Sequence, residues 1–210
     1  MRVYPSKRKV KISAPWYLRT EVIQNFAESR VDWIQKHFQK FKPQADSTRL
    51  EYLSGEKHPY QGKEYELRVH KFNGVPKIKL LLEDEVIVMK VRPGTTKAKR
   101  EKVLKEWYRA RLKEQIPKLI DKWEGPMGVV VSEYGVKQMK TRWGSCNIRA
   151  KRIWLNLELA KKSPACLESV VIHEMVHLLE RLHNKRFYRL MDKFLPDWRE
   201  IEKELHGRVD

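Results

Sequence analysis

Alternation and spacing of apolar residues divide the first part of the chain into short strands, a helix and a loop. Residues 1–14 alternate apolar and basic positions, which predicts short strands with a turn at Pro5-Ser6. Apolar residues at mostly helical spacing then predict a helix over about 20–41. The polar stretch 42–59 is typical of a connecting loop.

Three more strands and a long helix are predicted next. The segments 65–70, 76–83 and 84–91 alternate or run apolar, with turn-forming residues between them, and predict an antiparallel meander. A highly charged helix opens after Gly94. Pro117 lies inside it, and we expect a kink or a new helix there because proline lacks the N–H of a helical hydrogen bond.

The last part of the chain mixes strands with helices. We expect strands over 129–134, 136–142 and 152–156, and the connection WGSCNIRAK is typical of a turn-forming loop. Ser163 before Pro164 predicts a helix start, because serine caps a first turn and proline suits the first helical position. Two more helices follow, and the whole pattern predicts an α+β fold.

Composition narrows the class of protein. Hydrophobic residues make up 41% of 210 residues, which is typical of a globular chain. The longest apolar runs contain glutamate and histidine and are shorter than the roughly 20 residues of a membrane span. The start of the chain lacks the apolar segment of a secretory leader. The two cysteines, Cys146 and Cys166, suggest no disulfide framework, so we expect a cytoplasmic protein.

The chain is strongly basic, with a formal net charge of +18. Such an excess favours anionic partners, among them nucleic acid, nucleotides and acidic surfaces. Lysines and arginines that merely solvate exposed helices are the alternative interpretation. Charge alone therefore names no substrate.

The segment HEMVH carries the most specific chemistry. His173 and His177 are four residues apart, so on a helix they face the same way and can bind one zinc ion. Glu174 lies about 100° round the helix, where a general base can take a proton from a water polarised by the metal. Histidines hydrogen-bonded within a core are the alternative, but burying them unpaired would be costly.

A third ligand is needed, and His183 is the first candidate. It lies six residues after His177, a rotation of about 240° on a straight helix, so the helix must end or bend before it. The metzincin pattern HExxHxxGxxH has this spacing, but Glu180 stands here in place of its glycine. A carboxylate from a later helix, Glu202 or Glu204, is the alternative ligand.

Four segments in order, KTRWGSC, IWLN, SVVIHEMVH and LHNKRF, resemble the YgjP-like metal-dependent hydrolase family. The family's Asn-His pair is inverted here to His183-Asn184. The resemblance implies a zincin-like catalytic domain, with zinc held by His173, His177 and His183 and with Glu174 as the base. We accordingly expect a smaller N-terminal α+β region over 1–93 and the zincin-like catalytic domain over 94–210.

The hairpin before the active-site helix supplies candidate substrate-binding residues. Arg142, with Arg152 across the hairpin, could hold a phosphate or a carboxylate. Gly144 and Ser145 could offer backbone N–H groups to an oxyanion. The alternative is that the glycine and serine only form a turn and the arginines are solvated. Cys146 fits a small buried residue better than a ligand or nucleophile.

Three functions follow from these residues. The first is a zinc metallopeptidase, favoured by the HExxH motif. The second is a nucleotide pyrophosphatase or phosphohydrolase, which the resemblance implies for some family members with UTP and which the basic charge favours. The third is a nucleic-acid-associated protein whose metal is structural. The sequence does not predict an oligomeric state.

Overall fold

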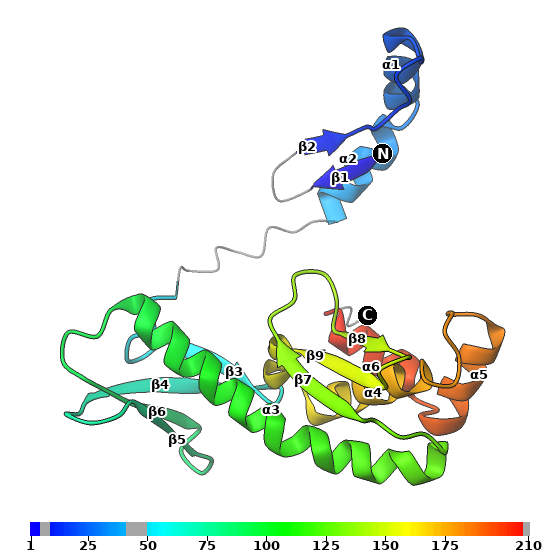
Figure 1. Ribbon diagram of the computed structural model, residues 1–210. Coiled ribbons are helices and arrows are strands. Elements are labelled where there is room, and N and C mark those ends of the chain that lie inside the picture. The colour runs from blue at the N-terminus through cyan, green and yellow to red at the C-terminus, as the bar shows by residue number, and fades with distance from the viewer. Residues whose placement is uncertain (5–8, 41–49, 208–210) are drawn as a thin grey trace. The chain divides into compact units, whose positions relative to one another are not determined.

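The computed structural model describes residues 1–4, 9–40 and 50–207 and contains two compact units, Met1–Leu50 and Glu51–Asp210 (Figure 1). The turn expected at Pro5-Ser6 lies outside the described residues, as do positions 41–49 of the expected helix end and loop. Within the described ranges, no helix has both the length and the apolar character needed to cross a membrane.

The first unit contains two short strands and two helices. These are β1 (Arg2–Tyr4), β2 (Lys9–Lys11), α1 (Thr20–Glu28) and α2 (Val31–Lys40), with β1 and β2 antiparallel. The expected single helix over 20–41 is therefore two. It is interrupted at Ser29, whose exposed hydroxyl donates to the Phe26 carbonyl at 2.9 Å.

The second unit begins with a four-stranded sheet in the order β3-β4-β6-β5. Its strands are β3 (Lys57–Tyr60), β4 (Lys63–Lys71), β5 (Lys77–Leu81) and β6 (Val86–Val91). The expected meander is wrong, because β4 pairs with β6 in parallel and β5 lies at the edge. Burial explains why β6 and not β5 lies next to β4. The strand β6 is the most buried of the sheet and takes a central position, whereas β5 is half exposed. The strand β3 also replaces part of the expected loop over 42–59.

A single long helix, α3 (Lys97–Met127), follows the sheet and continues through Pro117. The new helix considered at Pro117 is therefore absent, and Figure 1 shows α3 bending partway along its length. Its buried face carries Leu104, Tyr108, Leu112, Ile116 and Ile120 at helical spacing. The Tyr108 hydroxyl donates to the Pro59 carbonyl at 2.6 Å and ties the helix to β3.

The third sheet has the order β7-β9-β8. Its strands are β7 (Glu133–Lys137), β8 (Gly144–Asn147) and β9 (Arg152–Asn156), with β7 and β9 parallel and β8 and β9 antiparallel. One strand thus replaces the two expected over 129–134 and 136–142. The expected loop WGSCNIRAK contains β8, which is an edge strand.

Helices complete the second unit. They are the 3-10 helix η2 (Leu157–Lys161), α4 (Pro164–Val176), α5 (Lys185–Phe194) and α6 (Trp198–Leu205). The expected start of α4 is confirmed, because the Ser163 hydroxyl accepts a hydrogen bond from the Cys166 N–H at 3.3 Å. The α+β fold class is also confirmed.

The first sheet of the second unit shares its core with the helices that follow. The N–H groups of Gln61 and Gly62 donate to the carbonyls of Ala160 and Lys161, at 2.9 and 3.1 Å. The expected boundary at residue 93 therefore falls inside a compact unit, and a division of function there stays a prediction.

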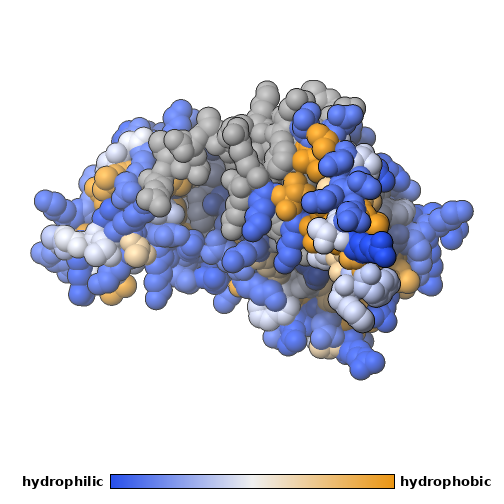
Figure 2. Space-filling view, turned by 90° about the horizontal axis from the view of Figure 1, so that it is seen from above, coloured by the Kyte–Doolittle hydropathy of each residue, from blue (hydrophilic) through white to orange (hydrophobic). Residues whose placement is uncertain are grey.

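Hydrophilic residues predominate over scattered hydrophobic ones on the face shown in Figure 2. On α3, many of the basic side chains have an acidic neighbour. The ion pairs are Lys97–Glu51, Lys105–Glu101, Arg109–Glu106, Arg111–Glu114 and Lys122–Glu168. Much of the positive charge of this helix is thus compensated within the chain.

Candidate metal centre and active site

The helix α4 carries His173 and ends just before His177. Val176 is its last residue, and His177 is the C-cap, with φ −62° and ψ −19°. The rings of His173 and His177 have centroids 5.0 Å apart. Both rings therefore reach one place from successive turns, as the four-residue spacing predicts.

His183 returns to the same place because the helix has already ended. After His177 the chain turns tightly, with the Glu180 N–H donating to the Val176 carbonyl at 2.9 Å. The Nε2 atoms of His183 and His173 are then 3.0 Å apart. Among the described residues, the group with ligand geometry consists of the three histidines and includes neither Glu202 nor Glu204.

The three ring nitrogens fit a tetrahedral metal ion. Nitrogens bound to one zinc ion at the usual distance are about 3.3 Å apart. The ligand atoms of the three histidines all lie within 4.8 Å of one another, so small side-chain movements suffice. Burial, with His177 and His183 nearby, lowers the pKa of His173 to about 3. The ring is therefore neutral at physiological pH, as a metal ligand must be.

Surrounding residues hold the histidine rings in place. The buried Phe187 ring lies against all three, with centroids 5.0, 4.8 and 4.5 Å from His173, His177 and His183. Asn184 caps α5 by accepting from the N–H groups of Arg186 and Phe187, at 2.9 and 3.1 Å. Phe187 and Asn184 both lie within four positions of His183, inside the LHNKRF segment. The sequence alone did not assign either residue a role in supporting the histidines.

One ring is also oriented by the backbone. The Nδ1 atom of His177 lies 3.2 Å from the Glu180 carbonyl. If Nδ1 carries the proton and donates it there, Nε2 has its lone pair free for a metal. Glu180, which stands in place of the metzincin glycine, thus supports the histidine cluster through its main-chain carbonyl.

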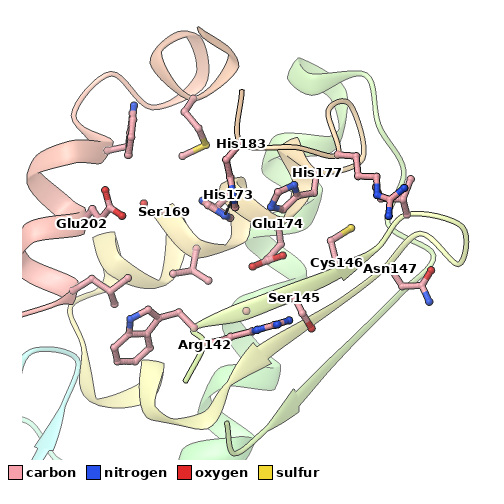
Figure 3. A pocket seen from close by; sticks show the side chains of 18 of the residues that line it. Arg142, Ser145, Cys146, Asn147, Ser169, His173, Glu174, His177, His183 and Glu202 are labelled. Atoms are coloured by element: carbon pink, nitrogen blue, oxygen red, sulfur yellow. Dashed lines mark hydrogen bonds between the residues drawn. The ribbon is translucent and has the colours of Figure 1, made fainter. Parts of the chain in front are cut away.

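Glu174 is buried beside the cluster, with 5% of its surface exposed. Burial raises its pKa to about 8, and the positive charge of Arg142 opposes that rise. Figure 3 shows the carboxylate between the histidines and the strand that carries Ser145. A Cβ at Gly144 would lie 2.5 Å from Oε1 of Glu174, so only glycine leaves room for this carboxylate.

Asn156 fixes the segment that leads into β8. This buried side chain donates to the carbonyls of Met139 and Arg142, at 3.1 and 2.8 Å. Its Oδ1 accepts from the Met139 N–H at 3.2 Å. The asparagine of the IWLN segment therefore has a positional role, which pattern reasoning did not find.

These residues surround an open pocket of about 1060 Å³. Arg142, Gly144 and Ser145 line it as expected. Arg152 does not; it pairs with Glu133 at 3.0 Å. The wall also includes residues that sequence reasoning did not single out as substrate-binding, which are Trp143, Asn147, Arg149, Ser169, Arg181 and Trp198.

The one cysteine in the pocket wall is not set up as a nucleophile. Burial, with Glu174 nearby, raises the pKa of the Cys146 thiol to about 11. The thiol is therefore protonated at neutral pH, and the thiolate is the reactive form. The side chain is half-buried, so the expectation of a small buried residue is met only in part.

Two solved structures are similar in part, both metallopeptidase zymogens. Abylysin of Pyrococcus abyssi is 18% identical, with a TM-score of 0.41 over 45% of this chain and 94% of that chain. Jannalysin of Methanocaldococcus jannaschii is 18% identical, with a TM-score of 0.40 over 45% of this chain and 97% of that chain. No curated protein matches.

A family model described as YgjP-like, metallopeptidase domain, matches residues 1–208. The match includes the histidine cluster, the hairpin of β8 and β9, and the first unit. A metallopeptidase domain implies hydrolysis with a divalent metal ion. The chain therefore belongs to the YgjP-like metallopeptidase family.

Proposed function

We propose that the protein is a zinc-dependent metallopeptidase with Glu174 as its general base. His173, His177 and His183 would hold the ion. The observation that carries the proposal is that three histidine rings and a buried carboxylate converge in the wall of one open pocket. Zinc bound there would polarise water and the scissile carbonyl. Three protein ligands beside a pocket are typical of a catalytic zinc site, whereas structural sites are closed by four.

The environment of Glu174 suits proton transfer. In the proposed reaction its carboxylate takes a proton from the attacking water and returns it to the leaving amine. Burial, opposed by Arg142, raises its pKa to about 8. A bound cation would favour the charged form of Glu174 and so lower its pKa from this raised value. The carboxylate could then both accept and donate a proton near neutral pH.

The strand β8 offers a place for an extended peptide. It is an edge strand of its sheet, and the pocket is lined by Gly144, Ser145, Cys146 and Asn147. An unpaired strand edge presents N–H and carbonyl groups that a peptide backbone can join as one more strand. Such a peptide would run past the three histidines, with one of its carbonyls close to them.

Two other functions remain as outcomes of the test. A nucleotide phosphohydrolase is favoured by the arginines of the pocket wall, because guanidinium groups also bind phosphate. A nucleic-acid-associated protein with a structural metal has less support. Many basic side chains of α3 already have acidic partners, and the three histidines lie in the wall of an open pocket.

The test incubates zinc-loaded protein in parallel with a mixed peptide library and with nucleoside triphosphates. Glu174→Gln removes the base, and Glu168→Gln on the same helix is the matched control, because Glu168 pairs with Lys122 and does not line the pocket. We expect peptide cleavage that falls at least about 100-fold in Glu174→Gln and persists in the control. Triphosphate hydrolysis alone would support the nucleotide function, and no activity with zinc still bound would support a structural metal.

A further inference from the structure

The two ends of the pocket differ in chemistry. The strand β8 runs along the pocket, and Figure 3 shows Glu202 and Ser169 on one side of the histidines and Asn147 on the other. The Glu202 end includes buried apolar side chains, Leu205 and Val170 among them. The Asn147 end continues into the turn after β8, which carries Arg149.

Two arginines of the pocket wall have no acidic partner among the residues that the structure describes. Arg149 and Arg181 are exposed, both line the pocket, and neither makes an ion pair with any residue in the described ranges 1–4, 9–40 and 50–207. Glu180, next to Arg181, is engaged elsewhere: its carboxylate accepts from the Leu182 N–H at 3.3 Å and lies 3.7 Å from Arg186.

The other arginines of the second unit are engaged in different ways within the described ranges. Arg92 and Arg100 donate to backbone carbonyls, and Arg189 is exposed without an acidic partner in those ranges. Arg109, Arg111, Arg152, Arg186 and Arg199 each have a carboxylate within 4.0 Å. Within the pocket wall, the carboxylates are Glu174, which lies near Arg142, and Glu202, which lies beyond the histidines. Arg149 and Arg181 therefore line the pocket without a carboxylate partner among the described residues, so their charge is available to a bound ligand.

We propose that Arg149 and Arg181 form a subsite for an acidic side chain of the substrate, next to the bond that is cleaved. The proposal rests on the proposed peptidase function and names its substrate class, peptides with aspartate or glutamate near the scissile bond. Guanidinium groups suit this role because their planar donors match a carboxylate. Arg149 follows β8 at the Asn147 end of the pocket, so we expect the preference on the side of the scissile bond that faces this end.

The test measures cleavage of peptides that share one sequence and differ only in having Glu, Gln or Lys at a single position. That position is varied over three places on each side of the cleaved bond. The enzymes are the zinc-loaded wild type and the double variant Arg149→Glu, Arg181→Glu. Arg189→Glu is the matched control, because Arg189 is exposed but does not line the pocket.

We expect the wild type to cleave the Glu peptide about tenfold faster in kcat/KM than the Lys peptide, at one position on one side. The double variant should reverse this order and the control should keep it. The preference should also shrink in 1 M salt, which screens exposed charges. Circular dichroism of each variant verifies that these surface substitutions leave the fold intact.

Three results would overturn the subsite. Cleavage with equal rates for Glu and Lys peptides refutes it while leaving the peptidase function intact. A preference for Glu that persists unchanged in the double variant assigns the specificity to other residues. Absence of cleavage of every peptide refutes both the subsite and the peptidase. If the double variant also loses triphosphate hydrolysis in that case, the arginines bind phosphate.

Discussion

Replacing Gly144 with alanine would show whether β8 sets the position of the Glu174 carboxylate. The new Cβ would lie 2.5 Å from Oε1 of Glu174, 2.8 Å from its Cγ and 2.9 Å from its Cδ. Ordinary van der Waals contact begins at 3.4 Å, so the carboxylate must retreat by about 0.9 Å. The side chain is almost fully buried and has little room to do so.

The size of the effect follows from this displacement. A misplacement of about 1 Å can cost an enzyme about 100-fold in rate, which corresponds to about 2.7 kcal/mol. Overpacking a buried site typically costs about 1–3 kcal/mol of unfolding free energy. The histidines are untouched by the substitution, so zinc content should stay at the wild-type level.

The assay combines peptide cleavage, zinc content and urea unfolding. Gly125→Ala is the matched control, because a Cβ at Gly125 meets nothing within 4 Å. A second comparison repeats Gly144→Ala in a Glu174→Ala background, where the clashing atoms are absent. There we expect the stability cost of Gly144→Ala to shrink by at least about 1 kcal/mol, since the two positions are in contact.

Two results would refute this reasoning. Full activity in Gly144→Ala would show that the carboxylate has room that the structure does not show. An equal stability cost in both backgrounds would assign the effect to the strand itself and not to Glu174.

Three further predictions concern the support of the site and the response to acid. Asn156→Ala removes the bonds to Met139 and Arg142 and should lower the unfolding free energy by about 2–3 kcal/mol in urea titrations, whereas an unchanged midpoint would deny the asparagine its anchoring role. Asn184→Ala removes the α5 cap, so we expect about 1 kcal/mol lower stability and weaker zinc binding in a chelator titration; unchanged affinity would separate the cap from the metal site. Burial lowers the pKa of His58, so the unfolded chain binds more protons below about pH 6.5 and stability falls as the pH drops. His58→Leu should lose less stability than the wild type between pH 7 and 5, and parallel pH profiles would contradict this.

The sequence predicted the start of α4 and the common direction of its histidines well, because both depend on local spacing. The spacing of His173 and His177 fixes their common direction on any helix, and Ser163 marks where the helix begins. The position of His183 was harder, since it depends on a helix end at His177 that no glycine or proline marks. The turn through Glu180 and the cap by Asn184 became visible only in three dimensions.

Strand pairing was the part that sequence reasoning could not supply. Turn residues between β4, β5 and β6 favour neighbours in sequence, yet the more buried β6 displaces β5 from the centre of the sheet. The residues Gly144 and Ser145 favour a turn, whereas the segment that contains them forms β8. In the structure the glycine serves a strand that passes close to Glu174, a contact between residues 30 positions apart that no local pattern encodes.

The arginines illustrate the same limit. Arg142 and Arg152 looked equivalent across the predicted hairpin, but only Arg142 lines the pocket, while Arg152 pairs with Glu133. Register and the partner strand β7 decide which side chain faces the site.

The zinc content of purified His183→Ala tests most directly whether three histidines make one metal site. After zinc loading and removal of free metal, elemental analysis should find about one zinc per chain in the wild type and in Glu174→Gln, and far less in His183→Ala. Equal zinc in all three proteins would show that another residue completes the site. A wild type without zinc would contradict the metal centre itself.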